Sequence, residues 1–257
     1  MKAWFITLFV VLSFLVCAPA SAQKLRIGVG LSKPPYIIKE TNSGVELDIL
    51  RRALEIAGYE TQPVYLPMKR ILYGLNKGDL DGGISLRPDI PINGYLSESM
   101  ITYQNFAISR AEENLVLDDL SDLHNVSVLA FQNANLLLGL NFSNAVEDNH
   151  KYSEISNQEL QAKMFLAGRV QVLIADFRIF LHFKNKIEKI YGGNKGVVFH
   201  ALFPPTLYHA GFKSEEVRNR FNKGLETLRQ SGEYDQILAR YINPDDDVRV
   251  RGSSISR

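Results

Sequence analysis

The sequence predicts an α/β fold with mostly parallel sheets. Short apolar strands alternate with amphipathic helices along most of the chain, the pattern of strand–helix–strand units. Glycine and proline punctuate this alternation, as at Gly58, Gly78, Gly168 and Pro204-Pro205. Once residues 1–22 are set aside, about 235 residues remain, enough for one large or two small units that each bury a core.

Residues 1–22 have the pattern of a cleaved secretory signal peptide. Lys2 supplies a positive start, and the apolar run from Trp4 to Val16 is too short to span a bilayer comfortably. Ala20-Ser21-Ala22 then provides small residues for cleavage before Gln23. A retained membrane anchor is the alternative. Lipidation of Cys17 is disfavoured, because Val16 is bulky where lipobox sequences have Gly or Ala.

The charge balance argues against nucleic acid and anionic lipid as partners. Cleavage after residue 22 would leave 28 basic and 28 acidic residues and no cysteine. A neutral chain without a Lys/Arg cluster offers no electrostatic footprint for either partner. The lost cysteine excludes disulfides and thiolate chemistry in the mature chain. No further run of about 18 apolar residues follows.

In the first part of the chain, Leu47, Leu50, Leu54 and Ala57 recur at helical spacing, and Gly58 follows as a stop signal. The predicted elements are a strand at 25–30, a helix at 45–57, a strand at 61–66, a helix at 69–76, a buried strand at 81–86 and an extended segment at 101–110. We expect the crossing into a second unit at Ala111-Glu112-Glu113-Asn114.

The second part repeats the same rhythm. Its predicted elements are strands at 126–130, 170–175 and 197–199 and helices at 134–140 and 158–167, followed by a strand at 207–212 and helices at 215–231 and 233–241. Pro204-Pro205 marks a return crossing. Residues 245–257 offer little to bury and are expected to form a flexible tail.

Several short motifs, in this order and spacing, resemble the periplasmic solute-binding proteins of family 3, the polar amino-acid type. They are Arg26-Ile27-Gly28-Val29 with Pro34-Pro35-Tyr36, Gly44-x-Glu46-x-Asp48, residues 75–82 (Leu-Asn-Lys-Gly-Asp-Leu-Asp-Gly), and Gly168-Arg169-Val170 leading to Asp176. The resemblance covers residues 24 to about 241. It implies a periplasmic-binding-protein-like fold of type II, with two α/β lobes, a hinge and a ligand cleft between the lobes.

The resemblance also implies domain boundaries and partners. Lobe 1 would comprise residues 23–108 and 204–244, and lobe 2 residues 109–203. The protein is expected to be a periplasmic monomer without a cofactor. It would bind a small polar ligand and deliver it to the permease of an ABC importer, or signal to a membrane sensor.

In lobe 2, the resemblance places Asp176 where amino-acid binders hold the ligand's ammonium group. Capping of the following helix is the alternative role for this carboxylate. Phe131-Gln132-Asn133 lies between a strand and a helix, where relatives offer donors to a ligand carboxylate. Gln132 or Asn133 could equally cap that helix, and its N–H groups attract anions.

In lobe 1, the family's carboxylate-binding arginine is missing, since no arginine occurs from Pro88 through Ser109. Ser85 lies where relatives have a Ser/Thr-rich turn and is a candidate ligand contact. Arg87, in the same turn, could replace the missing arginine with its planar fork, or could pair with Asp89 at the surface.

The other candidate contacts of lobe 1 come from positions that face the ligand in relatives. Tyr36 and Tyr103 are candidate ring contacts, with packing as the alternative. Lys33 stands where an aromatic platform is common, and Met68 and Arg70 stand near a further aromatic position. Glu46 and Asp48 are expected to serve the start of a helix.

Catalytic motifs are missing from the sequence. The five histidines have no metal-binding spacing, and no Gly-x-Ser-x-Gly elbow or phosphate-binding loop is present. Gly28-x-Gly30 lacks the third glycine of a dinucleotide fingerprint. A dehydratase-like enzyme on the same fold remains an alternative, because it needs only one acid or base such as Asp176 or Glu46.

Overall fold

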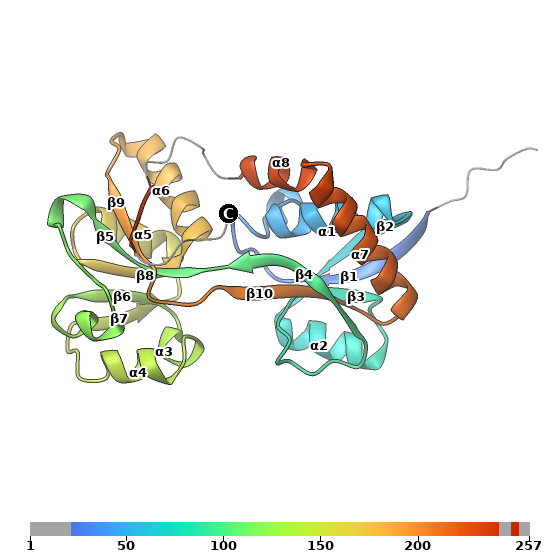
Figure 1. The fold of residues 1–257 in the computed structure, drawn as a ribbon, viewed down its shortest axis with the longest axis horizontal. Helices are drawn as coiled ribbons and strands as arrows, with labels where there is room; N and C mark the ends of the chain where they lie inside the picture. The colour runs from blue at the N-terminus through green and yellow to red at the C-terminus, as the bar shows by residue number, and fades with distance from the viewer. Residues whose placement is uncertain (1–21, 242–247, 252–257) are drawn as a thin grey trace, which may run out of the picture.

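The computed structural model of the protein describes residues 22–241 and 248–251. Two sheets lie side by side along the long axis of the molecule, and each is covered by helices (Figure 1). The predicted fold of two α/β lobes is confirmed. The predicted signal peptide lies outside the described residues, except for Ala22.

Lobe 1 contains a five-stranded sheet in the order β2-β1-β3-β10-β4. β1 is parallel to β2 and β3, whereas β10 is antiparallel to β3 and β4. Pro63 is tolerated because β2 is an edge strand. The elements are β1 (Gln23–Val29), η1 (Lys39–Thr41), α1 (Val45–Ile56), β2 (Tyr59–Tyr65), α2 (Met68–Lys77), β3 (Gly82–Leu86), β4 (Tyr95–Tyr103), β10 (Thr206–Phe212), α7 (Glu215–Gln230) and α8 (Glu233–Ala239).

Lobe 2 contains a six-stranded sheet in the order β11-β9-β5-β8-β6-β7. β6 is parallel to β7 and β8, and β5 is antiparallel to β8 and β9. The elements are β5 (Asn105–Arg110), η2 (Ala111–Glu113), η3 (Leu120–Asn125), β6 (Val128–Phe131), α3 (Ala134–Leu137), α4 (Leu140–Val146), β7 (Tyr152–Ile155), α5 (Gln158–Leu166), β8 (Val172–Asp176), α6 (Phe177–Tyr191), β9 (Val197–His200) and β11 (Val248–Arg251).

The chain crosses between the sheets at two points that can be followed in Figure 1. The first crossing is at Gln104, because β4 belongs to the first sheet and β5 to the second. It therefore comes earlier than the expected position at residues 111–114, which form η2 and its C-cap Asn114 after β5. The return crossing lies between β9 and β10 and includes Pro204-Pro205, as predicted.

The C-terminal segment differs from the sequence-based expectation. Val248–Arg251, placed in a flexible tail above, form β11, which pairs in parallel with β9 at the edge of the second sheet. Backbone pairing explains the difference, because a strand can add to an open sheet edge through main-chain hydrogen bonds alone. The remaining tail residues, 245–247 and 252–257, lie outside the described residues.

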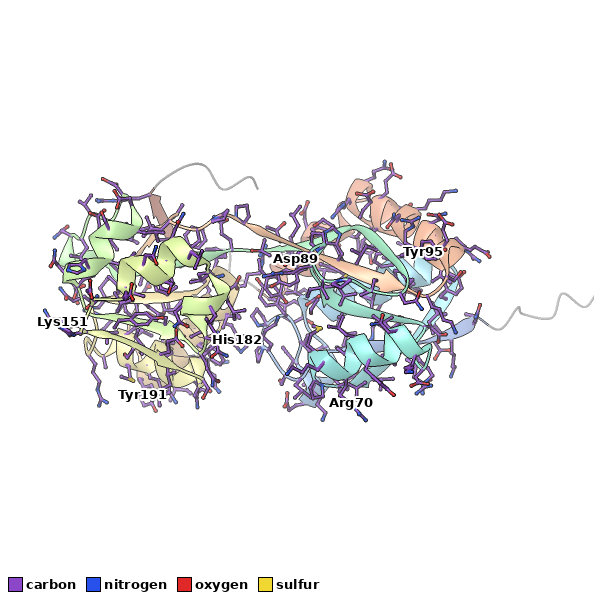
Figure 2. The ribbon with its side chains drawn as sticks, turned by 90° about the horizontal axis from the view of Figure 1, so that it is seen from below. Arg70, Asp89, Tyr95, Lys151, His182 and Tyr191 are labelled. Carbon is purple, nitrogen blue, oxygen red and sulfur yellow. The ribbon has the colours of Figure 1, made fainter. Side chains whose placement is uncertain are left out.

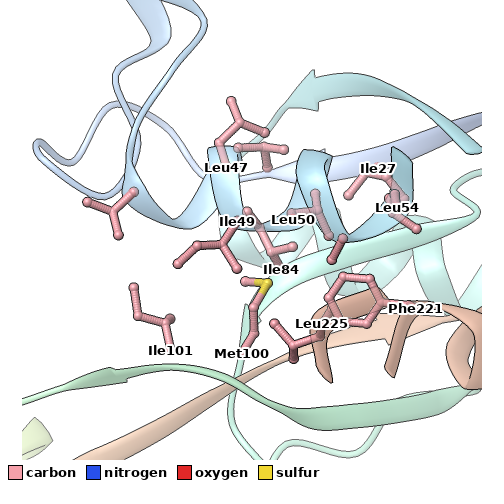
Figure 3. Packing of buried hydrophobic residues seen from close by; sticks show 14 of the residues in the cluster. Ile27, Leu47, Ile49, Leu50, Leu54, Ile84, Met100, Ile101, Phe221 and Leu225 are labelled. Carbon is pink, nitrogen blue, oxygen red and sulfur yellow. The ribbon is translucent and has the colours of Figure 1, made fainter. Parts of the chain in front are cut away.

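The core of lobe 1 holds α1 against the sheet and α7. Leu47, Leu50 and Leu54, the predicted apolar stripe, are fully buried in one cluster with Phe221 and Leu225 of α7 (Figure 3). Ile179 of α6 belongs to the same cluster. The start of α6 therefore packs against lobe 1, although β8, which precedes it, belongs to the sheet of lobe 2.

Candidate functional site

Asp176 ends β8 at the junction of the two lobes, and its carboxylate begins α6. One carboxylate oxygen accepts hydrogen bonds from the backbone N–H groups of Arg178 and Ile179, at 3.0 and 3.1 Å. The other accepts one from the N–H of Gln104 in the first crossing, at 3.1 Å. Helix capping, the alternative weighed for this residue, is therefore observed. Its role toward a ligand stays a prediction.

Tyr36 connects Asp176 to lobe 1. Its hydroxyl donates to the two carboxylate oxygens of Asp176, at 2.9 and 3.0 Å, and both side chains are buried. A second contact between the lobes joins the Nη1 of Arg178 to the carbonyl oxygen of Thr102 in β4, at 3.0 Å. Burial raises the pKa of Asp176, and the nearby Arg178 charge only partly opposes this effect.

A tight turn after β1 fixes the position of Tyr36. The N–H of Tyr36 donates to the carbonyl oxygen of Lys33 at 3.0 Å, and the N–H of Lys33 donates to that of Ile37 at 2.7 Å. Gly44, with φ +126°, then brings the start of α1 back against this turn, where the N–H of Glu46 donates to the carbonyl oxygen of Tyr36 at 3.1 Å. The motifs around Pro34-Pro35 and Gly44 thus build one corner of the site.

Glu46, expected at the start of a helix and considered as an acid or base in the enzyme alternative, is a fully buried carboxylate. Gly44 is the N-cap of α1, and Glu46 lies in its first turn. The Ser85 hydroxyl donates to both carboxylate oxygens at 2.8 Å, and the Tyr103 hydroxyl donates to one of them at 2.8 Å. Glu46 lies four residues before Leu50 and therefore on the same buried face of α1. This helical spacing is the sequence signal that could have placed Glu46 in the core.

Ser85 takes a backbone conformation that is uncommon for a residue with a side chain. Its φ is +60°, in the left-handed region, at a position in the buried strand β3. This conformation accompanies the hydrogen bonds of its hydroxyl to Glu46. Backbone strain of this kind is concentrated at functional sites.

Tyr36 and Tyr103 stack with their ring centroids 3.7 Å apart, and Tyr208 of β10 lies beside them, 4.4 Å from Tyr103. Burial raises the pKa of both Tyr36 and Tyr103 well above the ordinary value, so both hydroxyls stay protonated as donors. Tyr208 was not predictable as a member of this cluster, because an aromatic residue in a strand is most often a packing residue.

The Lys33 ammonium lies next to these three rings. Its Nζ is 4.4 Å from the centroid of Tyr103, 5.6 Å from that of Tyr36 and 6.0 Å from that of Tyr208. The two ring centroids and Nζ form a triangle with sides of 3.7, 4.4 and 5.6 Å. In this triangle the line from the Tyr103 centroid to Nζ is almost perpendicular to the line that joins the two centroids. Nζ therefore lies beside Tyr103 and not above the stacked rings. Burial lowers the pKa of Lys33, against the opposing charges of Glu46 and Asp176.

Met68 and Arg70 lie outside this cluster, whereas Arg87 lies at its border, where burial raises the pKa of Tyr208 and the charge of Arg87 acts to lower it. Nε and Nη2 of Arg87 donate to the two carboxylate oxygens of Asp89, the surface pair considered as its alternative. Figure 2 shows Asp89 on the side of lobe 1 nearest lobe 2 and Arg70 at the periphery of the lobe. Arg70 is exposed near the ring of Tyr73, and Met68 is half-buried against the small core under α2. Their ligand roles stay predictions.

The helix start at Gln132 and Asn133 already has an anion from the protein itself. The Glu154 carboxylate accepts hydrogen bonds from the N–H groups of Asn133 and Asn135, at 2.6 and 3.0 Å, and from the Tyr152 hydroxyl at 2.6 Å. Asn133 is the N-cap of α3 by position, with φ +63°, but its side chain makes no capping bond, and Gln132 is exposed. Phe131 is half-buried against the core of lobe 2.

Other features of the described ranges do not alter this picture. A surface hollow of about 430 Å³ lies in lobe 2 between α5 and α6, away from the tyrosine cluster. No helix among the described residues is long and apolar enough to cross a bilayer. Within the same residues, no three His, Cys, Asp or Glu side chains are grouped to hold a metal ion.

Comparison with known families identifies the chain. The family described as bacterial extracellular solute-binding proteins, family 3, matches residues 25–244. The chain belongs to this family. The match spans both lobes and includes every residue of the cluster around Tyr36, Glu46, Tyr103 and Asp176.

Individual relatives are distant. A probable histidine-binding protein of Neisseria gonorrhoeae is 24% identical over 208 residues, which cover 77% of this chain and 74% of the relative. An ancestral cationic amino acid solute-binding protein has a similar structure, with a TM-score of 0.67, 18% identity and coverage of 86% of this chain and 96% of the other. A histidine kinase sensor domain similar to periplasmic binding proteins matches with a TM-score of 0.59, 15% identity and coverage of 87% and 97%.

Proposed function

We propose that the protein is an extracytoplasmic solute-binding protein that captures a small, polar, amino-acid-like ligand between its two lobes. The observation that carries this proposal is the buried polar cluster at the lobe junction, where Tyr36 of lobe 1 donates to Asp176 of lobe 2. Clefts between domains are favoured ligand sites, and closure of two lobes follows from extra ligand contacts in the closed state. The ligands of the histidine-binding and cationic amino-acid relatives support an amino-acid-like solute.

Binding without catalysis is the role proposed for this cluster. Family membership supports it, because the family is one of binding proteins. The two buried carboxylates, Glu46 and Asp176, are engaged by hydroxyl and N–H donors, which suits fixed acceptors better than groups that exchange protons with a substrate. Turnover of a bound metabolite would contradict this part of the proposal.

The proposed location is the periplasm, after cleavage of residues 1–22, and the proposed partner is the permease of an ABC importer. A membrane sensor is the second candidate partner, favoured by the structural similarity to a histidine kinase sensor domain. A neighbouring gene for a permease and ATPase would support import. A neighbouring sensor gene would support signalling.

Native mass spectrometry of the purified protein tests the binding proposal directly, because it identifies a ligand that survives purification. The twenty L-amino acids are then tested one at a time for a rise in melting temperature, which any ligand of the folded state must cause by mass action. Small-angle scattering at saturating ligand should give a smaller radius of gyration. A protein that binds no member of this panel, or whose radius is unchanged by a ligand that binds, would argue against the proposal.

A further inference from the structure

Lys33 is a charged group of the tyrosine cluster whose ammonium forms no hydrogen bond with any described residue. Arg178, beside Tyr36, also has an unpaired donor, but this atom, its Nε, is buried from solvent. An ammonium carries three donors and no acceptor. Among the described residues, none accepts a hydrogen bond from its Nζ, and neither Glu46 nor Asp176 forms an ion pair with it. The rings beside it compensate only partly, because Nζ lies toward the edge of Tyr103, where the ring quadrupole does not attract a cation.

The other ionic groups near the cluster are paired or sealed from solvent, and the unpaired Nε of Arg178 belongs to the sealed ones. Asp176 accepts from Tyr36, Gln104, Arg178 and Ile179, which fills the capacity of its two oxygens. Glu46 is sealed from solvent beneath Ser85 and Tyr103.

Arg87 was the candidate to replace the carboxylate-binding arginine of the family. Its Nε and Nη2 already donate to the two carboxylate oxygens of Asp89. A cationic group would therefore meet acceptors that are engaged or sealed, whereas an anionic group would meet the free donors of Lys33.

We propose that Lys33 is the anchor for a carboxylate of the ligand, which rests on the edge of the Tyr36–Tyr103 stack and takes the unused donors of the Lys33 ammonium. This inference rests on the proposed function and adds the residue of this chain that holds the carboxylate of such a ligand. A carboxylate at Nζ completes the hydrogen bonding of a half-buried ammonium, and such charge-assisted bonds are among the strongest in proteins.

The test compares each L-amino acid that raises the melting temperature of the purified protein with its decarboxylated amine. Calorimetry is performed on the wild type, Lys33→Met and Lys33→Arg. For the wild type, the amine should bind at least about 30-fold more weakly than the amino acid, and Lys33→Met should lose at least about 30-fold in affinity for the amino acid.

Two further measurements separate a contact with the ligand from a general disturbance. The affinity of Lys33→Met for the amine should change little, because the group that contacts Lys33 is already gone, and Lys33→Arg should recover most of the affinity for the amino acid. Lys39→Met is the matched control: this exposed lysine also lies near a tyrosine ring, 5.8 Å from that of Tyr65, but in η1, outside the cluster.

The possible failures are distinct. Equal affinity of the wild type and Lys33→Met for the amino acid, or equal affinity of the wild type for amino acid and amine, overturns the inference and leaves solute binding intact. If Lys33→Met does not fold, Lys33→Gln takes its place as the variant without the charge, and Lys33→Arg remains the variant that should recover the affinity for the amino acid. A wild type that binds no amino acid overturns the proposed function and, with it, this inference.

Discussion

The hydroxyl of Tyr36 forms one of the contacts between the two lobes, and its removal tests how much that contact contributes. Tyr36→Phe keeps the ring and its stacking on Tyr103 but leaves Asp176 without its donor from lobe 1. Because hydrogen bonds to charged groups contribute more than neutral ones, we expect the free energy of unfolding to fall by about 1–3 kcal/mol. Urea unfolding measures this change, and scattering should show a larger radius in the ligand-free protein.

Tyr234→Phe provides the control for this substitution. The Tyr234 hydroxyl donates to the carbonyl oxygen of Met100 at 3.0 Å, a partly buried contact within lobe 1. Its loss should cost about 1 kcal/mol and leave the radius unchanged. If both variants gave the same radius as the wild type, the Tyr36–Asp176 contact would not restrain the lobes.

Single residues also show where reasoning from the sequence stops. Asp176, at the end of a strand, and Tyr36, at a turn, were identified as candidates from their positions in the family resemblance. Their contact was not predictable, because 140 residues separate them and no local rule orients one toward the other. Lys33 was a candidate by position, but its unused donors depend on neighbours contributed by β4, β10 and the start of α6.

At the scale of elements, the start of α3 shows how a predicted ligand site can be filled from within. Glu154 of β7 supplies the carboxylate for the N–H groups of Asn133 and Asn135. Burial acts to raise the pKa of Glu154, but the bonds from the Tyr152 hydroxyl and these N–H groups outweigh it, so that the pKa is lowered overall. A lowered pKa means that this carboxylate stabilises the fold above its ordinary pKa of 4.5 and that the contribution is lost as the pH falls through the lowered value.

Glu154→Gln should therefore destabilise the protein by about 1–2 kcal/mol at neutral pH, and by less in acid, where the wild-type carboxylate is protonated as well. Unfolding in urea at pH 7 and at about pH 3 measures the difference. The exposed Glu147, for which the described chain provides no such donors, gives the control Glu147→Gln, which should change stability little at either pH. A Glu154→Gln variant with tighter ligand binding would instead indicate that the ligand's anion competes for this helix start.

Most elements were predictable because their signals are local. α1, α2 and α5 each carry an apolar stripe and a glycine stop, and β3 and β8 are continuous apolar runs. The first half of β4 was missed, because shifts in its register with β10 break the alternation of a regular strand. The predicted helix at 134–140 is divided into α3 and α4 by Gly139, whose φ is +89°, and β7 is too short and too polar to stand out.

At the scale of the whole molecule, β11 links the lobes at a third place. α8 packs on α1 and α7 in lobe 1, yet β11, the next element along the chain, pairs with β9 in lobe 2 from Val248↔Val197 to Arg251↔His200. The N–H of Ala201 also donates to the carbonyl oxygen of Arg251, at 3.0 Å. Two crossings allow a hinge, and a third connection held by a strand ladder should limit how far the lobes separate.

Deletion of residues 248–257 tests this restraint. The truncated protein loses the β11–β9 ladder and leaves β9 as an unpaired edge, so we expect a melting temperature lower by a few degrees and a larger radius of gyration without ligand. Its affinity for the ligand should fall modestly. Without the β11–β9 ladder the lobes adopt a wider range of open arrangements, so that a smaller fraction of the protein is ready to close on the ligand. Deletion of residues 252–257 alone keeps β11 and should behave as the full chain does. If the two truncations gave the same radius and the same affinity, β11 would be an edge strand of lobe 2 with no part in the motion of the lobes.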